Sequence, residues 1–138
     1  MIKTKLLTKT AVIPTRGSEQ AAGLDLYADN EHTVLPNCVS VVPTGIAMAI
    51  PDGFVGLVWP RSGVSVPYGV DVLPGVIDSD YTGEIKVVLQ AGANDFEISQ
   101  GDRIAQLLIV PVSMLQCLEV DSLDDTARGD CGFGSTGI

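Results

Sequence analysis

The sequence has few of the residues that build metal clusters and disulfide frameworks. It contains one histidine, His32, and three cysteines, no two of which form a Cys-x-x-Cys pair. Structural zinc is usually held by four Cys or His ligands at short spacings, so we expect no zinc site. Three cysteines without such pairing also predict no closed disulfide framework, as is usual in a reducing compartment.

Basic residues are scarce as well. Eight Lys and Arg stand against 17 Asp and Glu, which gives a formal net charge of −9. Proteins that coat DNA or RNA bind phosphates mainly through Lys and Arg, so this balance argues against a nucleic-acid partner. It leaves open whether a small phosphate ligand binds at a few local charges.

Long apolar runs are absent too. No run reaches the roughly 18 residues of a membrane span, and the first ten residues, MIKTKLLTKT, lack a signal-peptide pattern. We therefore expect no membrane association and a cytoplasmic location, or the cytoplasm or nucleus of a host if the source is viral. Because 46% of the residues are hydrophobic and only 18% are charged, part of the surface is expected to meet another subunit.

The 138 residues suit one compact domain. Seventeen Val and ten Ile come in short runs separated by Gly, Pro, Asn and Asp, which predicts an all-β sandwich or barrel with few helices. The apolar run 107–112 is expected to be a strand buried on both faces. After Val120 the chain turns acidic and then glycine-rich. We therefore predict a β-domain, residues 1–125, and a flexible tail, residues 126–138.

Two polar stretches contain candidate anion-site residues. In segment 21–28 (AAGLDLYA), alternation places Asp25 on the face opposite Leu24 and Leu26. Asp25 is then either a solvent-facing carboxylate or part of a site. Segment 60–63 (PRSG) is either a loop with a surface arginine or an anion site of guanidinium, hydroxyl and backbone N–H groups.

A third stretch, 75–86 (GVIDSDYTGEIK), has two apolar arms around a polar turn and predicts a β-hairpin. Val76 and Asp78 share one face, and Ile77 takes the other. We expect Asp78 on the inner side, where a carboxylate is costly unless it is hydrogen-bonded or acts as a base. Two roles stay open for it: orienting a water as general base, or capping its own turn.

The last two stretches lie near the end of the chain. Segment 101–106 (GDRIAQ) is a turn that leads into a buried strand, where Gln106 either binds a ligand or satisfies a neighbouring strand's backbone. In the tail, Arg128, Ser135 and Thr136 lie on either side of Phe133.

The five stretches, AAGLDLYA, PRSG, GVIDSDYTGE, GDRIAQL and RGDCGFGSTG, follow one another between residues 21 and 137. In this order the chain resembles, almost end to end, the five-motif pattern of the trimeric dUTP pyrophosphatases (dUTPases). The resemblance implies a β jelly-roll (β-clip) fold, assembled as a homotrimer whose active sites are shared between subunits. It also implies that the tail of one chain closes over a neighbour's site.

The implied reaction is hydrolysis of dUTP to dUMP and pyrophosphate by water attacking the α-phosphorus. It limits uracil in DNA and supplies dUMP for dTMP synthesis. By this resemblance Asp78 is the catalytic base, and Tyr81 packs under the deoxyribose, where a ribose 2′-OH would collide. Uracil is recognised largely by backbone groups of the hairpin, whose further substrate-binding residues are Gly75, Val76, Ile77 and Lys86.

The same resemblance assigns the triphosphate to other motifs. Ser62, Gly63 and Gln106 hold the α- and β-phosphates, with Arg61 facing them. Asp25 reaches a Mg²⁺ ion through water, while the phosphates themselves hold the ion. In the tail, Phe133 stacks on uracil, and the remaining substrate-binding residues, most of them at the γ-phosphate, are Arg128, Gly134, Ser135 and Thr136.

One departure and two alternatives accompany the resemblance. Many members carry a Lys-His pair shortly after the second motif, where this chain has Pro67 and Tyr68. A dCTP deaminase, or a bifunctional enzyme of the same superfamily, would need a glutamate base where this chain offers Asp78. A trimeric regulatory or structural binding protein would not need the intact motifs, although sequence leaves an additional protein partner open.

Overall fold

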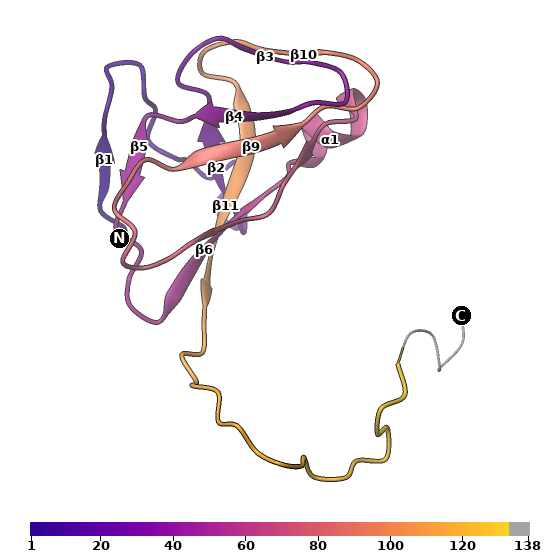
Figure 1. Ribbon diagram of the computed structural model, residues 1–138. Helices are drawn as coiled ribbons and strands as arrows, with labels where there is room; N and C mark the ends of the chain where they lie inside the picture. Colours follow the sequence, from indigo (N-terminus) through magenta and orange to yellow (C-terminus); the bar gives the residue numbers. More distant parts are fainter. Residues whose placement is uncertain (133–138) are drawn as a thin grey trace.

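The structure, a computed structural model, describes residues 1–132. Short β-strands form a body, and the last part of the chain leads away from it (Figure 1). The described residues contain one helix beside their strands, which confirms the predicted all-β class. Four substrate-binding residues expected in the tail lie outside the described residues: Phe133, Gly134, Ser135 and Thr136.

A four-stranded antiparallel sheet carries most of the motif residues. Its order is β2 (Leu24–Tyr27), β11 (Arg103–Pro111), β6 (Phe54–Trp59) and β8 (Gly75–Ile77). Gln106 of β11 pairs with Asp25 on one side and with Trp59 on the other. The pairing of β11 with β2 shifts register between Arg103 and Ala105, as at a β-bulge. This pairing brings the first, second and fourth motifs together at one end of the sheet.

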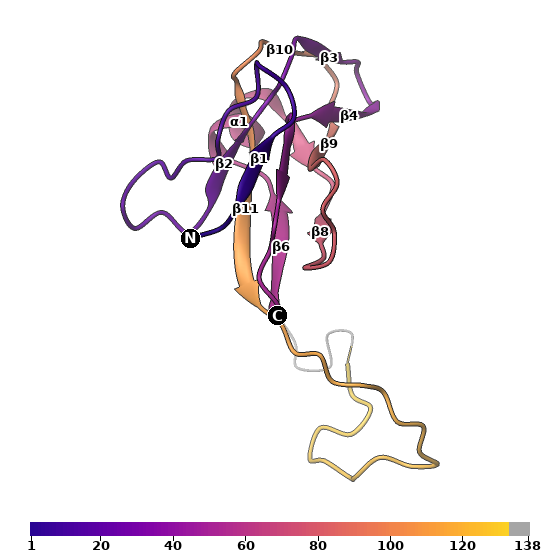
Figure 2. The ribbon, with the colours of Figure 1, turned by 90° about the vertical axis from the view of Figure 1, so that its left-hand side faces the viewer.

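Three smaller antiparallel sheets complete the body, as the two perpendicular views show (Figures 1 and 2). One has the order β4 (Val39–Pro43), β9 (Lys86–Gln90) and β7 (Asp71–Val72). The others pair β1 (Thr4–Leu6) with β5 (Ile46–Met48), and β3 (His32–Val34) with β10 (Phe96–Ile98).

Apolar side chains from all four sheets form one buried core. The largest of its fully buried aliphatic side chains are Leu26, Ile46, Ile85, Leu89, Ile104 and Leu107. The prediction that 107–112 is buried on both faces is wrong for a single chain, because after Leu107 the strand is only half-buried and Pro111 is exposed. The outer face of the four-stranded sheet also exposes Trp59 (51%) and Val76 (64%).

The predicted hairpin over 75–86 is wrong, because its two arms lie in different sheets. β8 pairs with β6, whereas β9 pairs with β4 and β7. The second arm is held elsewhere by Ile85, whose N–H donates to the Ile46 carbonyl (2.9 Å) and whose carbonyl accepts from Thr44 Oγ1. Val76 and Ile77 do take opposite faces, but the face that Val76 shares with Asp78 is the exposed one, not the inner one.

The PRSG segment begins a helix instead of forming a loop. The helix α1 (Ser62–Tyr68) has Arg61 as its extended N-cap residue and ends at Gly69, whose φ of +63° is the left-handed conformation that glycine favours. Val64 anchors the helix in the core. Tyr68, one of the two residues that depart from the Lys-His pair, packs against Phe96 with ring centroids 5.2 Å apart.

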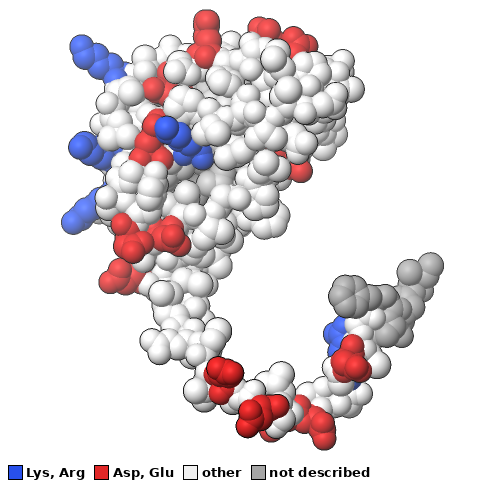
Figure 3. Space-filling view, viewed as in Figure 1, with Lys and Arg blue, Asp and Glu red and all other residues white. Residues whose placement is uncertain are grey.

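The chain leaves the body after β11, before the predicted tail begins at residue 126. Residues 112–132 contain no helix or strand, and acidic side chains recur along them (Figure 3). Four apolar side chains in this segment are 79–90% exposed: Met114, Leu115, Leu118 and Leu123. The described part of the tail therefore adds nothing to the core of its own chain.

Gly45 provides a stability test of the fold. Its φ is +66°, and a Cβ there would lie 2.8 Å from Ala11 Cβ and 2.8 Å from Asp29 Cγ. Because left-handed strain and overpacking add, Gly45→Ala is expected to lower the free energy of unfolding by about 2–4 kcal/mol. Gly53 is the matched control, since its φ is +78° with no atom within 4 Å of an added Cβ, and Gly53→Ala should cost only about 1–2 kcal/mol. Urea denaturation at one protein concentration measures both, and equal losses would contradict the packing argument.

Candidate functional site

The first candidate site centres on the carboxylate of Asp25. Its Oδ1 accepts from Arg61 Nε at 2.8 Å, and its Oδ2 accepts from Arg103 Nη1 at 3.4 Å. The Asp25 side chain is only 11% exposed. The solvent-facing alternative for Asp25 is therefore wrong. Two guanidinium groups around one carboxylate leave a net charge of one positive unit, which favours an anion.

Gln106 holds the segment that precedes the helix. Its Nε2 donates to the carbonyl of Pro60 at 2.8 Å, so its side chain satisfies the backbone of a neighbouring segment, one of the two roles left open for it. Gly23 makes room for this side chain, because a Cβ at Gly23 would overlap the Gln106 amide oxygen and lie 3.0 Å from its Cβ. These contacts fix the start of the helix beside Asp25.

A crevice of about 200 Å³ opens at this cluster. The first, second and fourth motifs all contribute to it, and its lining includes Asp25, Arg61, Ser62, Gly63, Arg103 and Gln106. An added Cβ on Gly63 would meet no atom within 4 Å, so the space next to Gly63 at the start of the helix is unfilled. The structure thus brings together the residues that the resemblance assigned to the α- and β-phosphates and to the metal.

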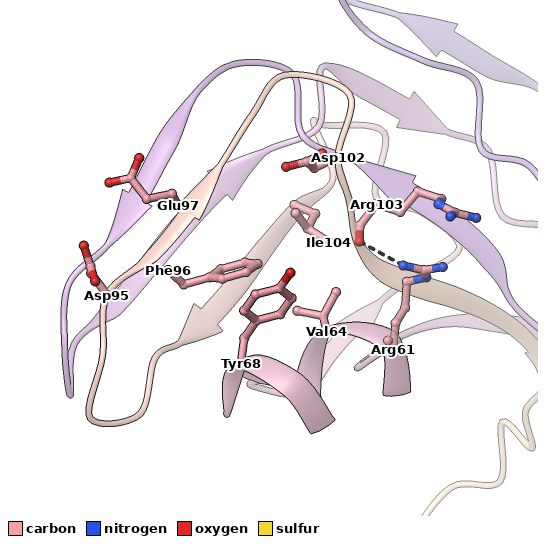
Figure 4. Close-up of a pocket in the computed structure, with 10 residues that line it drawn as sticks. Arg61, Val64, Tyr68, Asp95, Phe96, Glu97, Asp102, Arg103 and Ile104 are labelled. Atoms are coloured by element: carbon pink, nitrogen blue, oxygen red, sulfur yellow. Dashed lines mark hydrogen bonds between the residues drawn. The ribbon is translucent and has the colours of Figure 1, made fainter.

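A larger cavity of about 570 Å³ adjoins the same two arginines (Figure 4). Arg61, Gly63 and Arg103 line both spaces. The Tyr68 and Phe96 rings form its apolar wall, and three carboxylates also line it: Asp95, Glu97 and Asp102. In Figure 4 the Arg61 side chain donates to the Arg103 carbonyl, a bond of 3.0 Å.

Asp78 lies in a different cavity, of about 400 Å³, at the root of the tail. Val76 and Asp80 line it with Asp78, and so do Val112 and Met114. The turn-capping role of Asp78 is not seen among the described hydrogen bonds, where its backbone carbonyl accepts from Tyr81 N–H (3.1 Å) and its carboxylate makes no bond. This cavity and the arginine crevice share no lining residue.

The Tyr81 ring is fixed by its own turn. Its hydroxyl donates to the Glu84 carbonyl at 2.8 Å. A Cβ on Gly83 would lie 2.6 Å from that hydroxyl, so only glycine lets the ring lie over this turn. Glu84 in turn accepts from Gly45 N–H at 3.0 Å, and it also pairs with Lys86 at 3.5 Å. The 78–86 segment is therefore attached to the body at Glu84.

The remaining predicted residues lie apart from the crevice. Arg128 is in the tail, where its Nε donates to the Cys131 carbonyl at 2.9 Å. Gly75, Val76 and Ile77 form β8, on the far edge of the four-stranded sheet from Asp25. One chain therefore does not gather the whole predicted site.

The donor set suits a metal held through water more than one held directly. The described residues include no group of three or more His, Cys, Asp or Glu that could ligate a metal. Asp25 supplies one buried carboxylate whose oxygens already accept from two arginines. Such a carboxylate fits Mg²⁺, which keeps several of its own waters and binds phosphate oxygens.

Sequence reasoning missed the partnership of Arg103 with Asp25 and the contact between Gly83 and Tyr81. Arg103 is the first residue of the bulged strand β11, and only the pairing of β11 with β2 places it at Asp25. The GDR turn is a local signal for a charged residue, but no local signal gives its partner.

No helix among the described residues is long and apolar enough to cross a membrane.

The chain is similar to known proteins over nearly its whole length. The dUTPase family model matches residues 9–137. The chain is 49% identical to the deoxyuridine 5'-triphosphate nucleotidohydrolase of Syntrophotalea carbinolica, over 99% of this chain and 97% of the relative. It superimposes on the dUTPase of Staphylococcus bacteriophage 80alpha with dUPNHPP at a TM-score of 0.94, with 29% identity over 100% of this chain and 99% of the other.

A second solved structure concerns a metal. A mutant dUTPase from phage phi11 of S. aureus, which reveals the coordination of a structural Mg(II) ion, matches at a TM-score of 0.85. The two are 26% identical over 88% of this chain and 97% of the other. The fold and the crevice thus define an all-β protein of the jelly-roll (β-clip) class. Within that class, the chain belongs to the dUTPase family.

Proposed function

We propose that this protein hydrolyses dUTP to dUMP and pyrophosphate, the activity of a dUTP diphosphatase. The observation that carries the proposal is the crevice in which Asp25, Arg61 and Gln106 converge beside the start of α1. Its relatives in the dUTPase family are named for this reaction. The few basic residues are no obstacle, because a local arginine pair suffices for one triphosphate.

The triphosphate binds in the crevice. Ser62 and Gly63 at the helix start, together with Gln106, hold the α- and β-phosphates, and Arg61 faces them. Asp25 would hold Mg²⁺ through the ion's own waters, and the ion, bound by the phosphates, would neutralise charge that develops on the leaving pyrophosphate. Asp25 also orients Arg61 through the 2.8 Å bond to its Nε.

Asp78 acts as the general base that orients and deprotonates the attacking water. Its carboxylate is exposed in its cavity and makes no hydrogen bond among the described residues, so it is free to accept a proton. Tyr81 packs under the deoxyribose, where its fixed ring would collide with a ribose 2′-OH. Backbone groups of 75–77 bind the uracil, and Lys86 is a further substrate-binding residue.

We further propose that the active site is completed between subunits of a homotrimer. Within one chain the Asp78 cavity and the arginine crevice share no residue, although the proposed reaction needs both at one phosphorus. Trp59 and Val76, which are exposed on the outer face of the four-stranded sheet, supply apolar surface for such an assembly. Residues 1–125 form the domain, and residues 126–138, with Arg128, Phe133, Gly134, Ser135 and Thr136, close over a neighbour's site.

The three exposed free cysteines suit the proposed cytoplasmic location.

The experiment that tests the function is release of pyrophosphate from dUTP, with and without Mg²⁺. We expect turnover that depends on Mg²⁺, dUMP as the other product, and no ammonia from dCTP. Ammonia release from dCTP would indicate the deaminase alternative. Absence of turnover with both nucleotides would overturn the enzyme assignment and favour a binding protein.

A further inference from the structure

Two arginines share the carboxylate of Asp25, but the two guanidinium groups differ in how they are held. Arg61 donates through Nε to Asp25 (2.8 Å) and through Nη1 to the Arg103 carbonyl (3.0 Å), and its side chain is 21% exposed. The Arg103 guanidinium makes one longer bond, of 3.4 Å from Nη1 to Asp25 Oδ2, and its side chain is 51% exposed. A guanidinium has five N–H donors, so Arg103 keeps more of them for a ligand.

The position of Arg103 also points to a ligand. It lines the crevice of about 200 Å³ together with Ser62 and Gln106, and it lines the adjoining cavity of about 570 Å³ as well. It therefore lies where the two spaces meet. In Figure 4 the Arg103 guanidinium lies beside that of Arg61 and points away from the Tyr68 and Phe96 rings. Phosphates bound at Ser62 and Gly63 would occupy the same crevice as this guanidinium.

We propose that Arg103 is a further substrate-binding residue, which binds the distal phosphates of the nucleotide. This inference rests on the proposed function. Asp25 orients the Arg103 guanidinium, while Arg61 remains fixed by the same carboxylate and by the Arg103 backbone. The β- and γ-phosphates become the leaving pyrophosphate, so a charge held at this point also assists the departure of that group.

Two substitutions test the proposal. Arg103→Gln removes the charge, and Arg103→Lys keeps the charge but lacks the planar, multiple N–H donors of a guanidinium. The Arg61 bond to the backbone carbonyl at position 103 survives in both. Calorimetry measures affinity for dUMP, for the α,β-imido analogue of dUTP and for inorganic tripolyphosphate. Arg103→Gln should weaken binding of the analogue and of tripolyphosphate by about 10- to 100-fold, the range for a hydrogen bond to a charged group. Binding of dUMP should change less than twofold, and Arg103→Lys should lie between.

Lys9→Gln is the charge control, because Lys9 is exposed and lines none of the three site cavities. It should leave all three affinities unchanged. Equal losses for dUMP and the analogue in Arg103→Gln would show a merely structural role and overturn the proposal, as would affinities equal to wild type. If Arg103→Gln does not fold, Arg103→Lys tests the proposal by the same comparison of the affinity lost for the analogue with the affinity lost for dUMP. Failure of wild-type dUTP hydrolysis would overturn the proposed function separately, because tripolyphosphate binding does not depend on turnover.

Discussion

Asp78→Asn is expected to lower dUTP turnover by about 10²- to 10⁴-fold, the contribution of a positioned general base. Asparagine keeps the shape of the side chain and its oxygen acceptor, but it cannot take a proton from water. Because Asp78 is exposed and bonded to no described side chain, the substitution should not disturb the fold. Affinity for the α,β-imido analogue should therefore stay within a few-fold of wild type.

Asp80 offers the matched control for this prediction. It lies two residues further on, is exposed and lines the same cavity. Asp80→Asn removes the same charge from the same surroundings and should leave turnover nearly unchanged. Equal rates for Asp78→Asn and wild type, or an equal loss in both variants, would show that Asp78 is not the base.

Deleting residues 128–138 is expected to lower turnover by roughly 10²-fold or more, because closure over the substrate excludes water and completes its contacts. The melting temperature should hardly change. Among the described residues after Pro111 none is buried, so the core does not depend on the tail. Gel filtration should still give the proposed trimer. Normal turnover by the truncated protein would mean that the tail has no part in catalysis.

Mixing the two inactive variants tests whether the sites are shared. A mixed trimer of Asp78→Asn chains and truncated chains can contain a site with an intact Asp78 from one chain and an intact tail from another. If chains contribute separately, co-refolding the two should restore a measurable fraction of wild-type turnover. Mixtures no more active than their components would contradict the shared site and place Asp78 and the tail in the same chain's site.

The prediction for Asp78 depends on both the sequence and the structure. Asp78 was singled out because a carboxylate follows an apolar segment, and its role came from the five-motif resemblance. In the structure Asp78 lies on an exposed face instead of the expected inner one. Its cavity is separate from the arginine crevice. The role proposed for Asp78 and the sharing of sites between chains both follow from the resemblance, whereas the exposed position of Asp78, apart from the arginine crevice, does not.

By itself the sequence determined the features that depend on neighbouring residues. Short β-branched runs between turn residues predicted an all-β body, and the structure confirms it. Alternation placed Asp25 opposite Leu24 and Leu26, and it correctly separated Val76 from Ile77. These features follow from the two-residue period of a strand and from local turn chemistry.

The tertiary structure alone decided which strands pair and what each polar side chain meets. β8 and β9 follow one another in the chain, yet each is more stable against a distant strand, so the predicted hairpin does not form. Asp25 became a buried ion-pair centre only because β11 lies beside β2 and α1 begins nearby. Strand pairing and burial are set by contacts between residues far apart in the sequence, and a local pattern carries no information about those partners.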